Sequence, residues 1–252
     1  MDFKKKVVLI TGASRGIGKA TAIAFAEQNA HVVINYREND RAAGNTMTEM
    51  KIGDHLLVKC DLSKPLELKQ MVDLIIQKYG RIDVLVNNAG ISQIHEIDQV
   101  SFDDWQKAWH NIIQTNLIAV ANLCYLVAQK MIPMGGGRIV NVGSRGAFRG
   151  EPTQPAYGAS KAGLHALSQS LAKQLGKYHI FVNAIAPGWV ETEMATTFLK
   201  DEERASILAD TPLGRLIQPE EIASAVLFLA SEASSGTTGA ILDMNGASYL
   251  RT

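Results

Sequence analysis

Cysteine is scarce in this chain: only Cys60 and Cys124 occur in 252 residues. One stands at the end of an expected strand and the other inside a helical pattern, so neither a disulfide framework nor a CxxC motif can be built from them. Such usage is typical of a reducing compartment like the cytosol. The six histidines are scattered, and His95-Glu96 has no second histidine at metal-site spacing, so we expect no metal site.

An excess of charge of either sign is also missing. The chain has 25 Lys and Arg against 25 Asp and Glu, which gives a formal net charge of zero. There is no global basic field to attract nucleic acid, and we interpret the run Lys4-Lys5-Lys6 as the solvated start of a strand. We therefore expect no nucleic-acid partner.

Long apolar runs are the third absence. No uninterrupted run approaches the roughly 20 residues of a membrane-spanning helix, and residues 1–6 lead into a strand without an apolar signal region. Hydrophobic residues make up 46% of the chain and charged residues 20%, which suits a large core and argues against disorder. We expect a soluble, cytoplasmic protein with no membrane contact.

What is present is a regular alternation of short apolar and longer amphipathic segments. Strands are expected over residues 7–10, 31–35, 55–59, 84–86, 138–142, 180–184 and 240–243. Helices are expected over residues 17–28, 41–51, 67–79, 102–113, 116–131, 159–177 and 219–230. This alternation predicts an α/β fold: a Rossmann-type, doubly wound parallel sheet of about seven strands with helices on both faces. No repeat or linker divides residues 1–252, so we expect one domain.

Residues 187–218 form the one long irregular connection, with two short helical stretches expected inside it. Long connections in compact domains are often lids or binding loops. The apolar side chains that would close over a substrate are Trp189, Met194, Phe198 and Leu199. The alternative is a surface excursion packed on the domain.

A glycine-rich loop, TGASRGIGKA, directly follows the first expected strand and opens a helix. Gly12, Gly16 and Gly18 permit a tight turn and a close approach of the backbone to a pyrophosphate, which the amides at the helix start then bind. This context predicts an NAD(P)-binding loop. The alternative is that the glycines only turn the chain.

The end of the second strand bears on which dinucleotide is bound. Sites for NAD usually place a carboxylate there, but the chain reads Asn35-Tyr36-Arg37, and Glu38 comes slightly late. Arg37, with Ser14 and Arg15, can surround a 2′-phosphate, and a charge-assisted contact of this kind contributes about 1.5–3 kcal/mol. We therefore predict a preference for NADP(H) over NAD(H).

The segment PAYGASKAG places Tyr157 and Lys161 four residues apart, on one face of a helix. A lysine cation next to a phenol stabilises tyrosinate, so we expect Lys161 to lower the Tyr157 pKa from about 10, toward the range useful for acid–base catalysis. The alternative is a structural tyrosine beside a solvated lysine.

Several motifs occur in one order along the chain: Thr11–Gly18, Asn87-Asn88-Ala89-Gly90, Asn116, Ser144, Tyr157-Gly158-Ala159-Ser160-Lys161 and Pro187-Gly188. Together they resemble the short-chain dehydrogenase/reductase family over essentially the whole chain. The resemblance implies catalytic roles for Asn116, Ser144, Tyr157 and Lys161. The cofactor-binding residues expected from the loop and the resemblance are Gly12, Ser14, Arg15, Gly16, Ile17, Gly18, Arg37, Asp61, Leu62, Asn88, Ala89, Gly90, Tyr157, Lys161, Pro187, Gly188, Val190 and Thr192.

Within that family the chain is most similar to the 3-oxoacyl-[acyl-carrier-protein] reductases, in residues 137–144, 183–194 and 211–231. The resemblance implies reduction of a 3-oxoacyl thioester. These reductases often carry arginines just before the fifth strand and at the end of the tyrosine-bearing helix. This chain has no arginine at either place, and Lys173 and Lys177 are the cations near the end of that helix. Docking of an acyl carrier protein is therefore left open. The charged stretch 145–151 suits a polar or anionic substrate.

Two other functions stay open at this point. The same chemistry can serve a sugar, a polyol or another small carbonyl compound, and the fold can serve as a non-catalytic NADP(H)-binding sensor. The resemblance also implies a homo-oligomer, a tetramer, with the helices over 116–131, 159–177 and 219–230 and the last strand as candidate interfaces.

Overall fold

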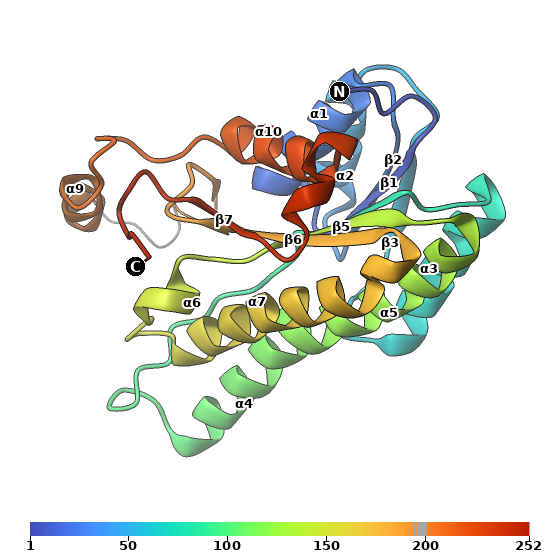
Figure 1. The fold of residues 1–252 in the computed structure, drawn as a ribbon. Helices are drawn as coiled ribbons and strands as arrows, with labels where there is room; N and C mark the ends of the chain where they lie inside the picture. Colours follow the sequence, from blue (N-terminus) through green and yellow to red (C-terminus); the bar gives the residue numbers. More distant parts are fainter. Residues whose placement is uncertain (194, 196–200, 252) are drawn as a thin grey trace.

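The structure is a computed structural model that describes residues 1–193, 195 and 201–251 (Figure 1). The strands in this part of the chain are β1 (Val7–Ile10), β2 (His31–Tyr36), β3 (Leu56–Lys59), β4 (Val84–Asn87), β5 (Gly137–Val142), β6 (Ile180–Pro187) and β7 (Ile241–Met244). They form one seven-stranded sheet in the order β3-β2-β1-β4-β5-β6-β7, with every pair parallel. The predicted fold class is confirmed.

The helices are α1 (Gly16–Glu27), α2 (Asp40–Glu49), α3 (Pro65–Tyr79), α4 (Phe102–Ile113), α5 (Ala119–Met131), α6 (Gly146–Arg149), α7 (Pro155–Leu175), α9 (Asp201–Ala209) and α10 (Pro219–Ala230). Each helix expected from the pattern is present. The α7 helix begins at Pro155, earlier than expected, because proline has no N–H to lose in the first turn and its fixed φ suits a helix start. This shift places Tyr157 in the first turn of the helix. The short α6 was not expected.

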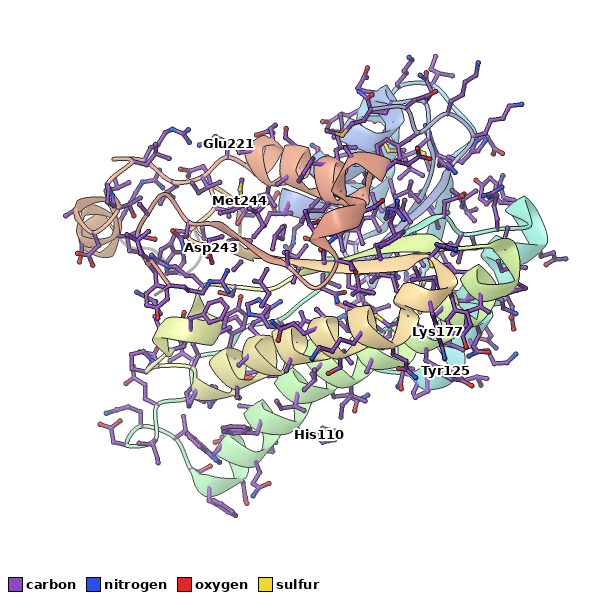
Figure 2. All side chains as sticks on the ribbon, viewed as in Figure 1. His110, Tyr125, Lys177, Glu221, Asp243 and Met244 are labelled. Atoms are coloured by element: carbon purple, nitrogen blue, oxygen red, sulfur yellow. The ribbon has the colours of Figure 1, made fainter. Side chains whose placement is uncertain are left out.

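Two hydrophobic layers hold the helices on the sheet. The pleat of β1 sends Val7 and Leu9 to one face and Val8 and Ile10 to the other. Residues of α3, α5 and α7 pack on the first face, whereas residues of α1 and α10 pack on the second (Figure 1). Side chains fill the space between these helices and the sheet (Figure 2). The near-continuous apolar character of the strands follows from this burial on both faces.

The helices α4 and α5 run on from each other through a π-helical turn, η1 (Gln114–Ile118). The resulting stretch, Phe102–Met134, has 33 residues and is apolar enough, by length and composition alone, to cross a membrane. Its side chains Leu123, Val127 and Met131 are fully buried in the core on the first face of the sheet. Packing on the sheet therefore accounts for part of the apolar character of this stretch, whereas other side chains, such as Tyr125, are exposed.

The strand order reverses between β1 and β4, the third and fourth strands of the seven-stranded order. In an open parallel sheet, the loops leaving the carboxyl ends of two such strands run in opposite directions and leave a crevice between them, where ligands bind. The glycine loop follows β1, and Asn88, Ala89 and Gly90 follow β4. Both motifs thus lie at the crevice.

Candidate active site

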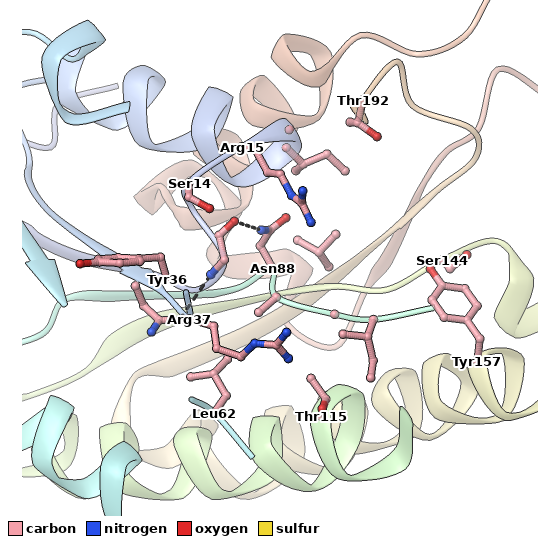
Figure 3. Close-up of a pocket in the computed structure, with 18 of the residues that line it drawn as sticks. Ser14, Arg15, Tyr36, Arg37, Leu62, Asn88, Thr115, Ser144, Tyr157 and Thr192 are labelled. Carbon is pink, nitrogen blue, oxygen red and sulfur yellow. Dashed lines mark hydrogen bonds between the residues drawn. The ribbon is translucent and has the colours of Figure 1, made fainter. Parts of the chain in front are cut away.

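A cavity of about 1150 Å³ extends along the carboxyl ends of the strands (Figure 3). Every segment that follows one of the strands β1 to β5, and the end of β6, contributes to its wall. Ser144 and Tyr157 lie side by side at one end, and Ser14 and Arg37 lie toward the other (Figure 3). A volume of this size and an elongated shape suit a dinucleotide with a small substrate beside it.

The glycine loop is built for close approach. Gly12 and Gly16 have φ of +62° and +54°, a region in which residues with a side chain are strained. A Cβ on Gly12 would lie 2.9 Å from the Ala89 Cα, and a Cβ on Gly18 would lie 2.4 Å from the Gly12 carbonyl oxygen. The loop therefore leaves its backbone open to the cavity at the start of α1, and its residues fit the pyrophosphate of a dinucleotide.

Hydrogen bonds hold the segment after β4 against this loop. The Asn88 side-chain amide donates to the carbonyl oxygens of Thr11 and Gly12, at 2.9 and 3.1 Å. In return, the Thr11 hydroxyl accepts from the backbone amides of Asn88 and Ala89, each at 3.0 Å. This wall of the cavity is therefore fixed before any ligand arrives.

The end of the cavity opposite Ser144 and Tyr157, where we expect the adenosine of a dinucleotide, carries two exposed arginines, and both guanidinium groups extend into the cavity (Figure 3). An Arg15 nitrogen lies 3.6 Å from a Glu193 carboxylate oxygen, and the Arg37 Nε lies 2.9 Å from Glu38. Burial acts to raise the Asp61 pKa, but hydrogen bonds from Ser63 and the charges of Arg37 and Lys64 outweigh it and lower that pKa. Asp61 is therefore an ionised acceptor at this end.

Three polar groups meet at the opposite end. Ser144 follows β5, and its Oγ accepts from the Gly146 amide at 3.0 Å, which leaves its own proton free to be donated. The Tyr157 and Ser144 side chains lie side by side (Figure 3), and the Ser144 hydroxyl acts to lower the pKa of Tyr157. The buried Lys161 donates to the Val142 carbonyl oxygen at 2.9 Å, and its Nζ lies 5.7 Å from the centre of the Tyr157 ring.

The titration of this group differs from the sequence-based expectation. Burial raises the pKa of Tyr157 to about 12, and the charge of Glu151 acts in the same direction; the Ser144 hydroxyl lowers it only in part. Burial also lowers the pKa of Lys161 to about 8. The expected lowering of the phenol pKa below 10 is thus wrong for this structure, because removal of the phenol from water dominates its titration. The phenol is protonated at neutral pH and can donate.

Asn116 lies in the π-helical turn and is fully buried. Its Oδ1 accepts from the Ile91 amide at 2.8 Å, while its Nδ2 donates to the Ile91 carbonyl oxygen at 2.9 Å and to the Ser160 hydroxyl at 3.1 Å. A Cβ on Gly90 would lie 3.4 Å from both the Asn116 Oδ1 and the Lys161 Nζ. Asn116 therefore fixes the segment after β4 from behind, next to Lys161; its expected catalytic role stays a prediction.

The cavity gathers nearly all of the residues that the sequence singled out. Those that line it are Gly12, Ser14, Arg15, Gly16, Ile17, Arg37, Asp61, Leu62, Asn88, Ala89, Gly90, Ser144, Tyr157, Lys161, Pro187, Gly188, Val190 and Thr192, together with Trp189. Gly18 and Asn116 stand behind the wall and support it. Met194, Phe198 and Leu199, expected in a lid, lie outside the described residues.

The sequence did not single out several other lining residues. They include Tyr36 and Asn39 beside Arg37, Ser63 after β3, and His110, Asn111, Gln114 and Thr115 on α4 and η1. The first three follow strand ends and were open to prediction from that position alone. The α4 and η1 residues were not, because a helix running alongside the cavity has no signature in its own sequence.

Comparisons with known proteins agree with this geometry. A family model described as enoyl-(acyl carrier protein) reductase matches residues 12–246. A 3-oxoacyl-[acyl-carrier-protein] reductase of Thermotoga maritima is 40% identical, over 98% of this chain and 98% of its own. The corresponding reductase of Salmonella typhimurium is 39% identical, over 99% of this chain and 100% of its own.

The fold has a close counterpart among solved structures. A protein from Sinorhizobium meliloti 1021, assigned as a short-chain alcohol dehydrogenase, superposes with a TM-score of 0.91 at 31% identity, over 98% of this chain and 97% of its own. With the sheet order, the glycine loop and the Ser144, Tyr157 and Lys161 cluster, these matches show that the chain belongs to the short-chain dehydrogenase/reductase family.

Proposed function

We propose that this protein is an NADPH-dependent reductase that converts a ketone to a secondary alcohol, and that the ketone is a 3-oxoacyl thioester. The observation that carries the proposal is the meeting of the Ser144 and Tyr157 hydroxyls beside the buried Lys161 at one end of the cavity. Support for the thioester comes from the relatives, which are named as 3-oxoacyl-[acyl-carrier-protein] reductases.

The chemistry divides between cofactor and protein. A reduced nicotinamide bound in the cavity would supply a hydride to the carbonyl carbon. Tyr157 donates its proton to the carbonyl oxygen as negative charge develops there, and its raised pKa keeps that proton in place at neutral pH. Ser144 donates a hydrogen bond to the same oxygen. Lys161, still mainly charged at neutral pH, stabilises the tyrosinate that remains.

The preference for NADPH is proposed on the two arginines of the adenosine end. Arg15 and Arg37 lie in exposed ion pairs with Glu193 and Glu38. Exposed pairs of this kind contribute about 0–1 kcal/mol, so a 2′-phosphate that makes charge-assisted contacts of about 1.5–3 kcal/mol each would replace them.

A second candidate substrate is a small polar carbonyl compound such as a sugar or polyol derivative. The segment after Ser144 carries the buried Arg145 and the Arg149–Glu151 pair, whose Nε and Oε1 lie 3.7 Å apart. The Glu151 charge acts on Tyr157 itself. This charged surrounding of the reacting end favours a polar substrate over a plain acyl chain.

The test is consumption of NADPH with acetoacetyl-CoA by the wild type, Tyr157→Phe and Tyr178→Phe. Tyr178 is an exposed tyrosine outside the cavity lining, so its variant controls for loss of a phenol. We expect turnover by the wild type and Tyr178→Phe, and a loss of about 10²–10⁴-fold in Tyr157→Phe, the usual worth of a general acid. If the protein binds NADPH but does not reduce acetoacetyl-CoA, polar ketones and sugars are tested next. No turnover of any of these compounds would support the function of a non-catalytic NADP(H)-binding sensor.

The remaining parts of the proposal concern assembly and location. We propose a cytoplasmic homo-oligomer, a tetramer, because the outer surfaces of α5 and α7 carry exposed side chains such as Tyr125, 65% exposed, and Ala162. Acyl carrier protein remains a possible donor of the substrate. Sedimentation of the purified protein tests the tetramer, and activity with acyl carrier protein against coenzyme A thioesters tests the donor.

A further inference from the structure

His95 is a buried polar side chain that the proposed mechanism does not use. It lies in the loop between β4 and α4 and has no exposed surface. Its Nε2 lies 3.2 Å from the Ala156 backbone nitrogen, and its Nδ1 lies 2.8 Å from the Gln93 carbonyl oxygen. A backbone amide only donates, so Nε2 must accept, and the ring proton must sit on Nδ1 and be donated to Gln93. The surroundings therefore select one neutral tautomer.

The amide that His95 accepts from belongs to the helix of Tyr157. Ala156 is the second residue of α7, and the residue at the cap position, Gln154, makes no capping hydrogen bond with its side chain. The Tyr157 amide donates to the Gln154 carbonyl oxygen at 3.0 Å. The Ala156 amide lies in the first turn, where backbone amides have no carbonyl partner inside the helix. His95 thus acts as the cap of α7 from a distant part of the chain.

Two further hydrogen bonds join the same segments. The Ser92 hydroxyl donates to the Gln154 side chain, and the His95 amide donates to the Thr153 carbonyl oxygen at 2.9 Å. Residues 92–95 and 153–156 are therefore tied by three contacts, which we call the 92–95 clasp. The Trp105 ring packs edge-on against the imidazole, with centroids 5.4 Å apart.

The clasp continues directly into the cavity wall. Ile91 lines the cavity and is held by Asn116, and Asn88 and Ala89 are held by Thr11. One short segment, 88–95, thus connects the glycine loop at one end with the first turn of α7 at the other. The position of the Tyr157 phenol relative to the cofactor side of the cavity depends on that connection.

We propose that His95 is a positioning residue for Tyr157: its neutral imidazole caps α7 and sets the first turn against the cavity wall. The inference rests on the proposed function, because it assumes that the Tyr157 phenol is the group that must be placed. A displacement of about 1 Å of a reacting group can cost about a hundredfold in rate. The effect should therefore appear in kcat more than in cofactor binding.

The experiment compares His95→Phe, which keeps a ring but removes both hydrogen bonds, with His95→Gln, whose amide can accept from Ala156 and donate to Gln93. Ser101→Ala is the matched control, because it removes the cap of α4, where the Ser101 hydroxyl accepts from the Asp104 amide at 3.2 Å. The readouts are kcat with acetoacetyl-CoA, Kd for NADPH, and hydrogen exchange of the amides of residues 156–159. The exchange readout needs no turnover.

We expect His95→Phe to lower kcat by about ten- to a hundredfold, to keep Kd for NADPH within about threefold, and to speed exchange at residues 156–159. His95→Gln should recover most of both losses, and Ser101→Ala should change neither. Unchanged exchange and kcat in His95→Phe would overturn the proposal, as would equal losses in His95→Gln and His95→Phe. If the wild type shows no turnover, the proposed function fails, and the exchange comparison still decides whether His95 caps α7. If His95→Phe does not fold, His95→Gln decides: wild-type kcat and exchange at residues 156–159 would support the proposal, and losses in both would contradict it.

Discussion

The burial of His165 predicts that the folded protein becomes less stable in acid. It lies on α7 one turn after Lys161 and is 3% exposed, and its ring stacks on Phe148 with centroids 4.9 Å apart. Neither ring nitrogen has a hydrogen-bond partner among the described residues. Burial, then the charges of Lys161 and Arg251, lower the pKa of His165 from 6.5 to about 4. The folded protein therefore holds this imidazole neutral at acidities where the unfolded chain protonates it.

The direction of the pH dependence of stability is set by the number of protons that His165 binds in the folded and unfolded states. Between pH 6.5 and 4 the unfolded chain binds more protons at this residue, so the free energy of unfolding falls as the pH falls through that range. The difference between the two pKa values corresponds to a change of at most about 3 kcal/mol in the free energy of unfolding, at about 1.36 kcal/mol for each pKa unit. About 2 kcal/mol of this should be lost between about pH 7 and about pH 4.5.

The assay is urea unfolding at these two pH values, at one ionic strength and one protein concentration, because an oligomer couples stability to concentration. His165→Leu removes the titrating group while keeping an apolar volume, and it should flatten the pH dependence by about 2 kcal/mol relative to the wild type. His110→Gln, which removes an exposed histidine, is the control for loss of a ring at the surface. An equal loss of stability in the wild type and His165→Leu would refute the reasoning.

Three further predictions concern the cofactor loop and the sheet. Arg37→Ala should reduce the preference for NADPH over NADH by about ten- to a hundredfold, measured as the ratio of kcat/KM values; an unchanged ratio would remove Arg37 from the phosphate site. Gly18→Ala forces a Cβ to 2.4 Å from the Gly12 oxygen and should weaken NADPH binding at least about tenfold, as measured by fluorescence titration. Gly44→Ala, with open space around the added Cβ, should leave the affinity unchanged, and equal affinities of the two variants would contradict the packing argument. Asp83→Ala leaves the buried first amide of β1 without its acceptor, 2.9 Å away, and should lower the free energy of unfolding by about 1–3 kcal/mol, which a denaturant midpoint at the wild-type value would disprove.

Much of this architecture can be predicted from the sequence, because the strands and helices have strong local patterns. The run Val7–Ile10 is apolar at every position, as burial on both faces demands. The glycine loop directly after it predicted one wall of the cavity, and the spacing of Tyr157 and Lys161 predicted their shared face. Each of these features depends on neighbours in the chain.

Other features depend on contacts between distant segments and were out of reach. The raised pKa of Tyr157 reflects its burial, which the four-residue spacing to Lys161 does not reveal. The π-helical turn around Asn116 accompanies hydrogen bonds to Ile91, 25 residues away. The role proposed for His95 depends on a contact with Ala156, 61 residues away, and no sequence pattern near His95 predicts that contact.

The most direct test of the central claim is transfer of label from NADPH carrying deuterium at both C4 hydrogens to acetoacetyl-CoA. Mass spectrometry of the product would locate the deuterium. We predict one deuterium on the carbon that bore the ketone with the wild type, and a rate of labelled product about 10²–10⁴-fold lower with Tyr157→Phe. Labelled product formed at equal rates by both proteins would contradict the assignment of Tyr157, and unlabelled alcohol from the wild type would contradict hydride transfer itself.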